Sequence, residues 1–169
     1  RQAMLRETEL FFETIMKEDR SVLDLIDSDF TFLNALLAKH YGITKTGGEK
    51  PKTLKFKGAD FQRVLLPDRK RGGLLTQASV LTVTSNPTRT SPVKRGRWVL
   101  EQILGSPPPP PPPNVPELEE SGKALSAATL RKRMEIHRKN SSCANCHAKM
   151  DPIGFALENY DAIGGYRTQ

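Results

Sequence analysis

The sequence predicts a mainly α-helical fold, a short helical bundle with little β-structure. Apolar residues recur at helical spacing through several segments, and Ser-Pro and Gly signals mark helix starts and ends. The length of 169 residues is enough for one domain or two small ones. Apolar residues make up only 37% of the chain, so the core that side chains alone provide is expected to be thin.

The first 42 residues are expected to form three short helices. Apolar positions between Met4 and Met16 follow an amphipathic helical pattern, and the solvent side of this helix is expected to carry Glu7, Glu9, Glu13 and Lys17. A second segment begins at Ser21. A third begins at Asp29 and ends at Gly42, because glycine commonly ends helices.

Residues Ile43–Lys57 are expected to form an exposed loop, because they contain two glycines, a proline and five lysines. A boundary is placed here. It divides the chain into residues 1–57, a helical subdomain with its linker, and residues 58–169, a second module.

The second module is expected to begin with a short strand at Phe61–Leu66 and a basic turn at Asp68–Gly73. A helix is then favoured over Leu74–Val83. A clearer helix starts at Ser91-Pro92, with serine as the cap and proline in the first turn, and ends at Gly105.

Seven consecutive prolines at Pro107–Pro113 predict a stiff polyproline II strut of roughly 22 Å. Its simplest use is as a spacer between helices, although such a run is also the ligand of SH3-type modules. A basic amphipathic helix is expected at Leu125–Lys139.

The segment 140–169 contains Cys143, Cys146 and His147 in the pattern C-x-x-C-H, which is the attachment signature of a c-type haem. Thiols one helical turn apart can add to the two vinyl groups of a porphyrin and aim the adjacent histidine at the iron. Three alternatives stay open. They are a zinc site completed by His147 with His137 or His40, a thioredoxin-like redox pair, and a simple disulfide.

His147 is the expected proximal iron ligand. The string C-x-x-C-H-x-x-M resembles one found in membrane-anchored multihaem quinol dehydrogenases, where the methionine takes this role, so Met150 is the alternative proximal ligand. No methionine or histidine follows Met150. The candidate distal ligand is therefore His137, with His40, Met134 and Met16 as further options.

The net charge is +7, and Lys and Arg residues cluster at 69–71, 94–97, 131–133 and 138–139. No nucleic-acid motif accompanies them, so we expect no nucleic-acid partner; an acidic redox partner or a neighbouring haem domain fits better. Arg89 and Arg95 are candidate contacts for haem propionates, since guanidinium groups bind carboxylates in a bidentate manner. No stretch is long and apolar enough for a membrane span.

The run RGGLLTQASVLTVTSNPTRTSPVKRGRWVLEQILGSPPPPPPPNVPEL, followed by CANCHAKMDPIGFALENYDAIGGYR, resembles the haem-bearing C-terminal module of large exported cytochrome-c-containing proteins of planctomycetes and related bacteria. These modules are domains of unknown function. The opening RETELFFETIMKEDRSVLDLIDSDFTFLNALLAKHYG resembles the end of the module that precedes it. The resemblance implies a haem c on Cys143 and Cys146, export to the periplasm or the cell exterior, and membership of a larger polypeptide or complex. It implies no reaction.

These observations predict a c-type cytochrome module with one covalent haem that transfers electrons within a larger exported redox protein. A haem enzyme with an open iron site, of peroxidase-like activity, is one alternative; a zinc-stapled interaction module is the other. Whether the chain is an enzyme stays open, with electron transfer the favoured role.

Overall fold

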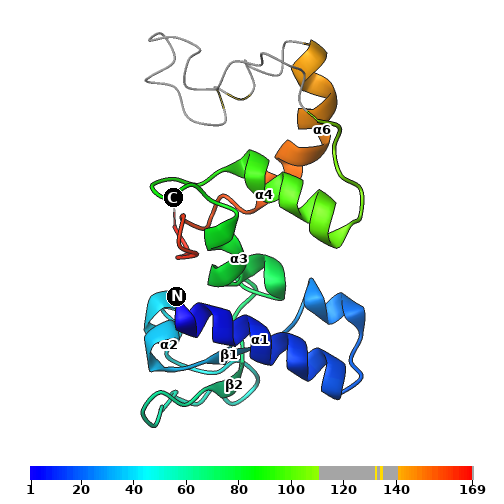
Figure 1. The fold of residues 1–169 in the computed structure, drawn as a ribbon. Helices are drawn as coiled ribbons and strands as arrows, with labels where there is room; N and C mark the ends of the chain where they lie inside the picture. Colours follow the sequence, from blue (N-terminus) through cyan, green and yellow to red (C-terminus); the bar gives the residue numbers. More distant parts are fainter. Residues whose placement is uncertain (111–131, 133, 135–140, 169) are drawn as a thin grey trace. The chain divides into compact units, whose positions relative to one another are not determined.

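A computed structural model describes residues 1–110, 132, 134 and 141–168. The described chain is mainly helical with one small sheet, which confirms the predicted fold class (Figure 1). It divides into two compact units. The first unit comprises Arg1–Thr90 together with Glu158–Gln169, and the second comprises Ser91–Leu157.

Helix α1, Gln2–Lys17, confirms the first predicted helix and buries Glu7, Phe11 and Ile15 at four-residue intervals. Phe11 packs on Phe30, with ring centroids 5.3 Å apart. The segment that begins at Ser21 forms only one turn of 3₁₀-helix, η1 at Val22–Leu25, where the Ser21 hydroxyl accepts a hydrogen bond from the Leu23 amide.

The prediction of a helix from Asp29 to Gly42 is wrong in its first half. Residues Phe30–Leu33 form strand β1, and helix α2 follows at Ala35–Tyr41, capped by Asn34 and ended by Gly42 at φ +70°. The strand sequence Phe-Thr-Phe-Leu is rich in aromatic and β-branched residues that favour strands. So short an apolar run cannot be assigned by its periodicity alone.

Strand β2, Gln62–Leu65, lies inside the strand predicted at Phe61–Leu66 and confirms it. It pairs antiparallel with β1, so that Phe30 lies opposite Leu65 and Leu33 lies opposite Gln62. The connection between α2 and β2 is a loop, as predicted, with one isolated bridge between Lys45 and Thr53.

The loop at residues 43–57 is less exposed than expected. Ile43 is buried, and Leu54 and Phe56 pack partly against the core of the first unit. That unit therefore continues through the loop without a break, whereas the sequence placed a boundary after Lys57. The division into modules at residue 57 stays a prediction.

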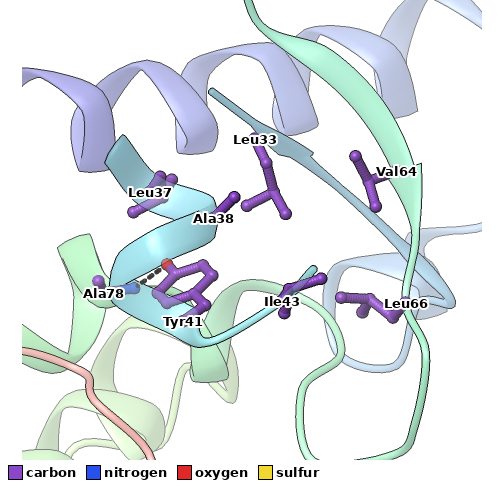
Figure 2. Packing of buried hydrophobic residues seen from close by; sticks show 8 residues of the cluster. All are labelled: Leu33, Leu37, Ala38, Tyr41, Ile43, Val64, Leu66 and Ala78. Carbon is purple, nitrogen blue, oxygen red and sulfur yellow. Dashed lines mark hydrogen bonds between the residues drawn. The ribbon is translucent and has the colours of Figure 1, made fainter. Parts of the chain in front are cut away.

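The core of the first unit gathers side chains from α2, both strands and the start of α3 (Figure 2). Its members are Leu33, Leu37, Ala38, Tyr41, Ile43, Val64, Leu66 and Ala78. Tyr41 brings its hydroxyl into this apolar cluster, where the oxygen accepts a hydrogen bond of 2.8 Å from the Ala78 amide. The tyrosine thus ties α2 to the start of α3.

The helix predicted at Leu74–Val83 is present in two pieces, the 3₁₀ turn η2 at Leu74–Thr76 and helix α3 at Ala78–Val83. Gln77, between them, has the extended backbone angles φ −74° and ψ 141°. Gly164 of the C-terminal segment lies against Ala78, and the φ of +81° at this glycine is one that other residues rarely adopt.

Replacing Asn34 with alanine should destabilise the first unit by about 1 kcal/mol, because the Asn34 side chain accepts a hydrogen bond of 2.9 Å from the Leu37 amide and caps α2. Urea denaturation followed by tyrosine signals measures this, since all three tyrosines lie in the first unit. Asn34→Asp should retain most of the stability, and Lys39→Ala on the exposed side of α2 is the control. Equal losses for alanine and aspartate would contradict a capping role.

The second unit is built on helix α4, Pro92–Trp98, and helix α6, Ser141–Ala156. Ser91 caps α4 by accepting from the Lys94 amide at 3.3 Å, as predicted. The helix continues as a π-helical turn, η3 at Val99–Ile103, before Gly105. The prolines after Pro110 lie outside the described residues. So does the helix predicted at Leu125–Lys139, of which only residues 132 and 134 are described.

Helices α4 and α6 cross at very short range because each presents a glycine to the backbone of the other (Figure 1). A Cβ atom on Gly96 would overlap the Met150 carbonyl oxygen and lie 3.1 Å from Met150 Cα. A Cβ atom on Gly154 would overlap the Pro92 carbonyl oxygen. These two contacts therefore hold the middle and the C-terminal end of α6 in one defined position against α4.

Candidate haem-attachment site

The residues of the C-x-x-C-H pattern lie in the first two turns of α6. Cys143 and Cys146 are one helical turn apart, and His147 follows one turn after Cys143. A single regular helix therefore carries the complete pattern. The helix continues through Pro152 to Ala156, so the pattern has more than two further turns of helix behind it.

Cys146 is a free thiol of intermediate burial. Its sulfur lies 3.9 Å from the carbonyl oxygen of Pro109, within S–H···O hydrogen-bond range. Pro109 thus lies beside the pattern although it is 37 residues away in sequence. The role of the proline run as a spacer stays a prediction.

The His147 imidazole is oriented by a neighbour that the sequence reasoning missed. Its Nδ1 lies 2.9 Å from Oδ1 of Asp151, one helical turn later. The Asp151 side chain is fully buried and that of His147 is 17% exposed. The signal was present in the sequence, since His and Asp four residues apart meet on one helix face.

Met150, the alternative proximal ligand, is buried in the second unit with its backbone against Gly96. Arg95 is also buried in this unit, and its Nη1 donates to the Leu157 carbonyl at 2.7 Å. The structure thus brings Met150, Arg95 and the pattern into one unit. Their predicted roles toward iron and propionate stay predictions.

Two of the other candidates, Arg89 and His40, belong to the first unit. Arg89 is exposed in the first unit, where its carbonyl accepts from the Asn86 amide. His40 is in the same unit and its Nε2 lies 2.8 Å from the Ile163 carbonyl oxygen. Met16 is 67% exposed, Met134 is buried, and His137 lies outside the described residues.

Two features are absent from the described residues. No group of three or more His, Cys, Asp or Glu side chains among them could by itself hold a metal ion. No helix in the described part is long and apolar enough to cross a membrane.

Comparison with known families assigns both parts of the sequence. Residues 71–169 match the family model PSCyt3, described as a protein of unknown function (DUF1588). The chain belongs to the DUF1588 family. Residues 1–43 match a second model, PSD4, described as a protein of unknown function (DUF1592). No curated protein and no solved structure matches the chain.

A buried polar cluster joins the DUF1592 and DUF1588 regions inside the first unit, and it corrects the expectation that Glu7 lies on the solvent side of its helix. Glu7 is 1% exposed. It accepts hydrogen bonds of 2.6 Å from the Thr31 hydroxyl and 2.6 Å from the Tyr41 hydroxyl. Burial raises the pKa of Glu7 from 4.5 to about 7, although both hydrogen bonds and the nearby Arg71 act to lower it.

Arg71, the first residue of the DUF1588 match, fastens the C-terminal segment to this cluster. Its guanidinium carbon lies 3.7 Å from the centre of the Tyr41 ring. Its two terminal nitrogens donate to the carbonyl oxygens of Thr76 and Gly164. Burial lowers the pKa of this arginine.

The positions of Arg71 and Arg95 also correct the picture of the basic clusters. They belong to the basic clusters at 69–71 and 94–97, which were expected to face an acidic partner, and both are buried. Among the described residues, each of these two clusters therefore exposes fewer basic side chains than the sequence indicated. Arg69, Lys70, Lys94 and Arg97 are their exposed or partly exposed members.

Proposed function

We propose that this chain carries one covalent haem c on Cys143 and Cys146 and acts as an electron-transfer module within a larger exported protein. The observation that carries the proposal is the geometry of α6. One regular helix holds both cysteines and His147, and Asp151 fixes the Nδ1 side of the imidazole. Nε2 is then the ring nitrogen suited to a metal.

The described residues fit such a group. Cys146 forms no disulfide among the described residues and is not fully buried, as a thiol must be to form a thioether. In this arrangement Cys143 and Cys146 would hold the porphyrin edge and His147 would bind the iron. A bound haem supplies one-electron chemistry between ferrous and ferric iron, and protein ligands and hydrogen bonds tune its potential.

The protein's own contribution is rigidity. Gly96 and Gly154 let α4 and α6 approach closely, which holds the backbone around Met150 and Asp151 in place. The Pro109 carbonyl lies beside the Cys146 sulfur and helps to define the approach to it. A site held this way changes little between oxidation states, which suits electron transfer.

The proposal predicts covalent haem in the full chain when it is exported in a bacterium that has c-type maturation. We expect a haem-staining band that survives denaturing electrophoresis, a mass increase of one haem, and sharp Soret and α bands after reduction. The double variant Cys143→Ser, Cys146→Ser should lose all three signals, whereas Asn145→Ala, between the cysteines, should keep them. Exported wild-type protein without Soret absorption would overturn the proposal.

Carbon monoxide separates the proposed carrier from the haem enzyme with an open iron site. An unchanged reduced spectrum on adding the gas indicates two protein ligands and supports electron transfer. A shifted Soret band indicates an open position and favours the enzyme. His137→Ala tests the distal ligand, since loss of the low-spin spectrum identifies His137 and an unchanged spectrum excludes it.

A further inference from the structure

The strongest feature outside the attachment pattern itself is the pair His147 and Asp151. The carboxylate lies on the helix turn that follows the histidine, and the Nδ1 to Oδ1 distance is 2.9 Å. Asp151 is completely buried, whereas the imidazole keeps partial exposure. The buried end of the pair is therefore the carboxylate, and the imidazole extends from it toward the surface.

An ionised carboxylate only accepts hydrogen bonds, so a hydrogen bond with Asp151 requires the proton of neutral His147 to sit on Nδ1. Nε2 then carries the lone pair. When a metal-binding histidine donates its other ring N–H to a carboxylate, this hydrogen bond sets the tautomer and orientation of the ring and makes the ligating nitrogen more basic.

We propose that Asp151 is a positioning residue that fixes the His147 ring and strengthens its Nε2 as an iron ligand. This inference rests on the proposed function, because it concerns the same site. Asp151 is held by the contact between the Met150 backbone and Gly96, one residue away along α6. The carboxylate therefore occupies a rigid part of the second unit, and water does not screen its charge.

A more basic proximal ligand stabilises ferric iron relative to ferrous iron, so Asp151 lowers the reduction potential of the site. Replacing it with asparagine keeps the shape and an acceptor oxygen but removes the charge. In the Asp151→Asn variant the haem content should stay at the wild-type level and the midpoint potential should shift upward.

The measurement is a redox titration of the haem-loaded full chain followed by its visible spectrum. Glu101→Gln is the matched control, because it removes one carboxylate from the same unit at a site that bonds to Arg97. Its potential should stay close to the wild-type value. If Asp151→Asn binds haem and keeps the wild-type potential, the inference is overturned while the proposed function stands.

Two further outcomes separate this inference from the proposed function. Absence of haem from the wild-type chain overturns the proposed function, and the role of Asp151 toward iron falls with it. If Asp151→Asn does not fold, the imidazole ¹⁵N chemical shifts of the haem-free wild-type chain show which ring nitrogen of His147 carries the proton. The His147 signals are assigned among the three histidines as those that disappear in the His147→Gln variant. Protonation at Nδ1 supports the inference, and protonation at Nε2 overturns it.

Discussion

The Gly154→Ala variant should be less stable in the second unit by about 3 kcal/mol, although alanine is normally the better helix residue. A Cβ atom there would overlap the carbonyl oxygen of Pro92 and lie 2.8 Å from its Cα. These are backbone atoms, so no side-chain rotation can relieve the overlap. The helices must separate, and the contacts on both sides of the crossing are lost with them.

The sign of the effect tests the helix crossing. At an exposed helical position, changing glycine to alanine stabilises by up to about 1 kcal/mol. Loss of stability at Gly154, and likewise at Gly96, therefore identifies close packing rather than helix propensity.

Trp98, the only tryptophan, lies at the end of α4 in the second unit. Its fluorescence during urea denaturation therefore reports the unfolding of that unit, while the tyrosines report the first. The control is Ala148→Ser at an exposed position of α6, which should change stability by less than about 0.5 kcal/mol. A Gly154→Ala variant as stable as wild type would contradict the crossing.

The second large effect concerns pH. The first unit should lose roughly 3 kcal/mol of stability as the pH rises from 4.5 to above 7, because the pKa of Glu7 is 4.5 in the unfolded chain and about 7 in the folded one. In this interval the folded state holds a proton that the unfolded state has released. The contribution is fully present below pH 4.5 and is lost as the pH passes through about 7.

The cause is the burial of the carboxyl group between α1, β1 and α2. Thr31 and Tyr41 bond its two oxygens, and the nearby Arg71 favours the ionised form, but these effects do not offset the loss of hydration. Burial also raises the pKa of Tyr41 well above 10, so its hydroxyl remains a donor to Glu7 over this range.

The Glu7→Gln variant should show a flatter pH profile than wild type and be more stable at pH 8, because an amide resembles the protonated acid. The free energy of unfolding of both proteins is measured by urea denaturation at pH 4.5, 6, 7 and 8, with tyrosine fluorescence as the signal. Glu9→Gln is the control, since Glu9 lies on the exposed side of the same helix and pairs with Arg6. Parallel profiles for wild type and Glu7→Gln would refute the assignment to Glu7.

Several elements could be predicted from local sequence because their causes are local. These elements depend on residues within one or two helical turns. They are the apolar spacing of α1, the start of α4 at Ser91-Pro92, and the end of α2 at Gly42. The C-x-x-C-H pattern belongs to the same class, and its placement on one helix follows from its spacing. Its use for haem stays a prediction.

Other features depended on partners far away in sequence. Residues Phe30–Leu33 are a strand because β2, about thirty residues later, pairs with them. Glu7 looked like a solvent-facing residue on its own helix, and it is buried because Thr31 and Tyr41 supply hydrogen-bond donors. No pattern inside α1 reveals those donors.

By itself the sequence determined the helical class, the C-x-x-C-H pattern, the Ser91 cap of α4 and the end of α2 at Gly42, because hydrogen-bonding and periodicity rules act over a few residues. Only the tertiary structure decided that Arg71 and Arg95 are buried, that Gly96 and Gly154 meet the facing backbone, and that Asp151 is excluded from water. The physical reason is that burial belongs to a residue's whole surroundings, and segments distant in sequence provide most of them.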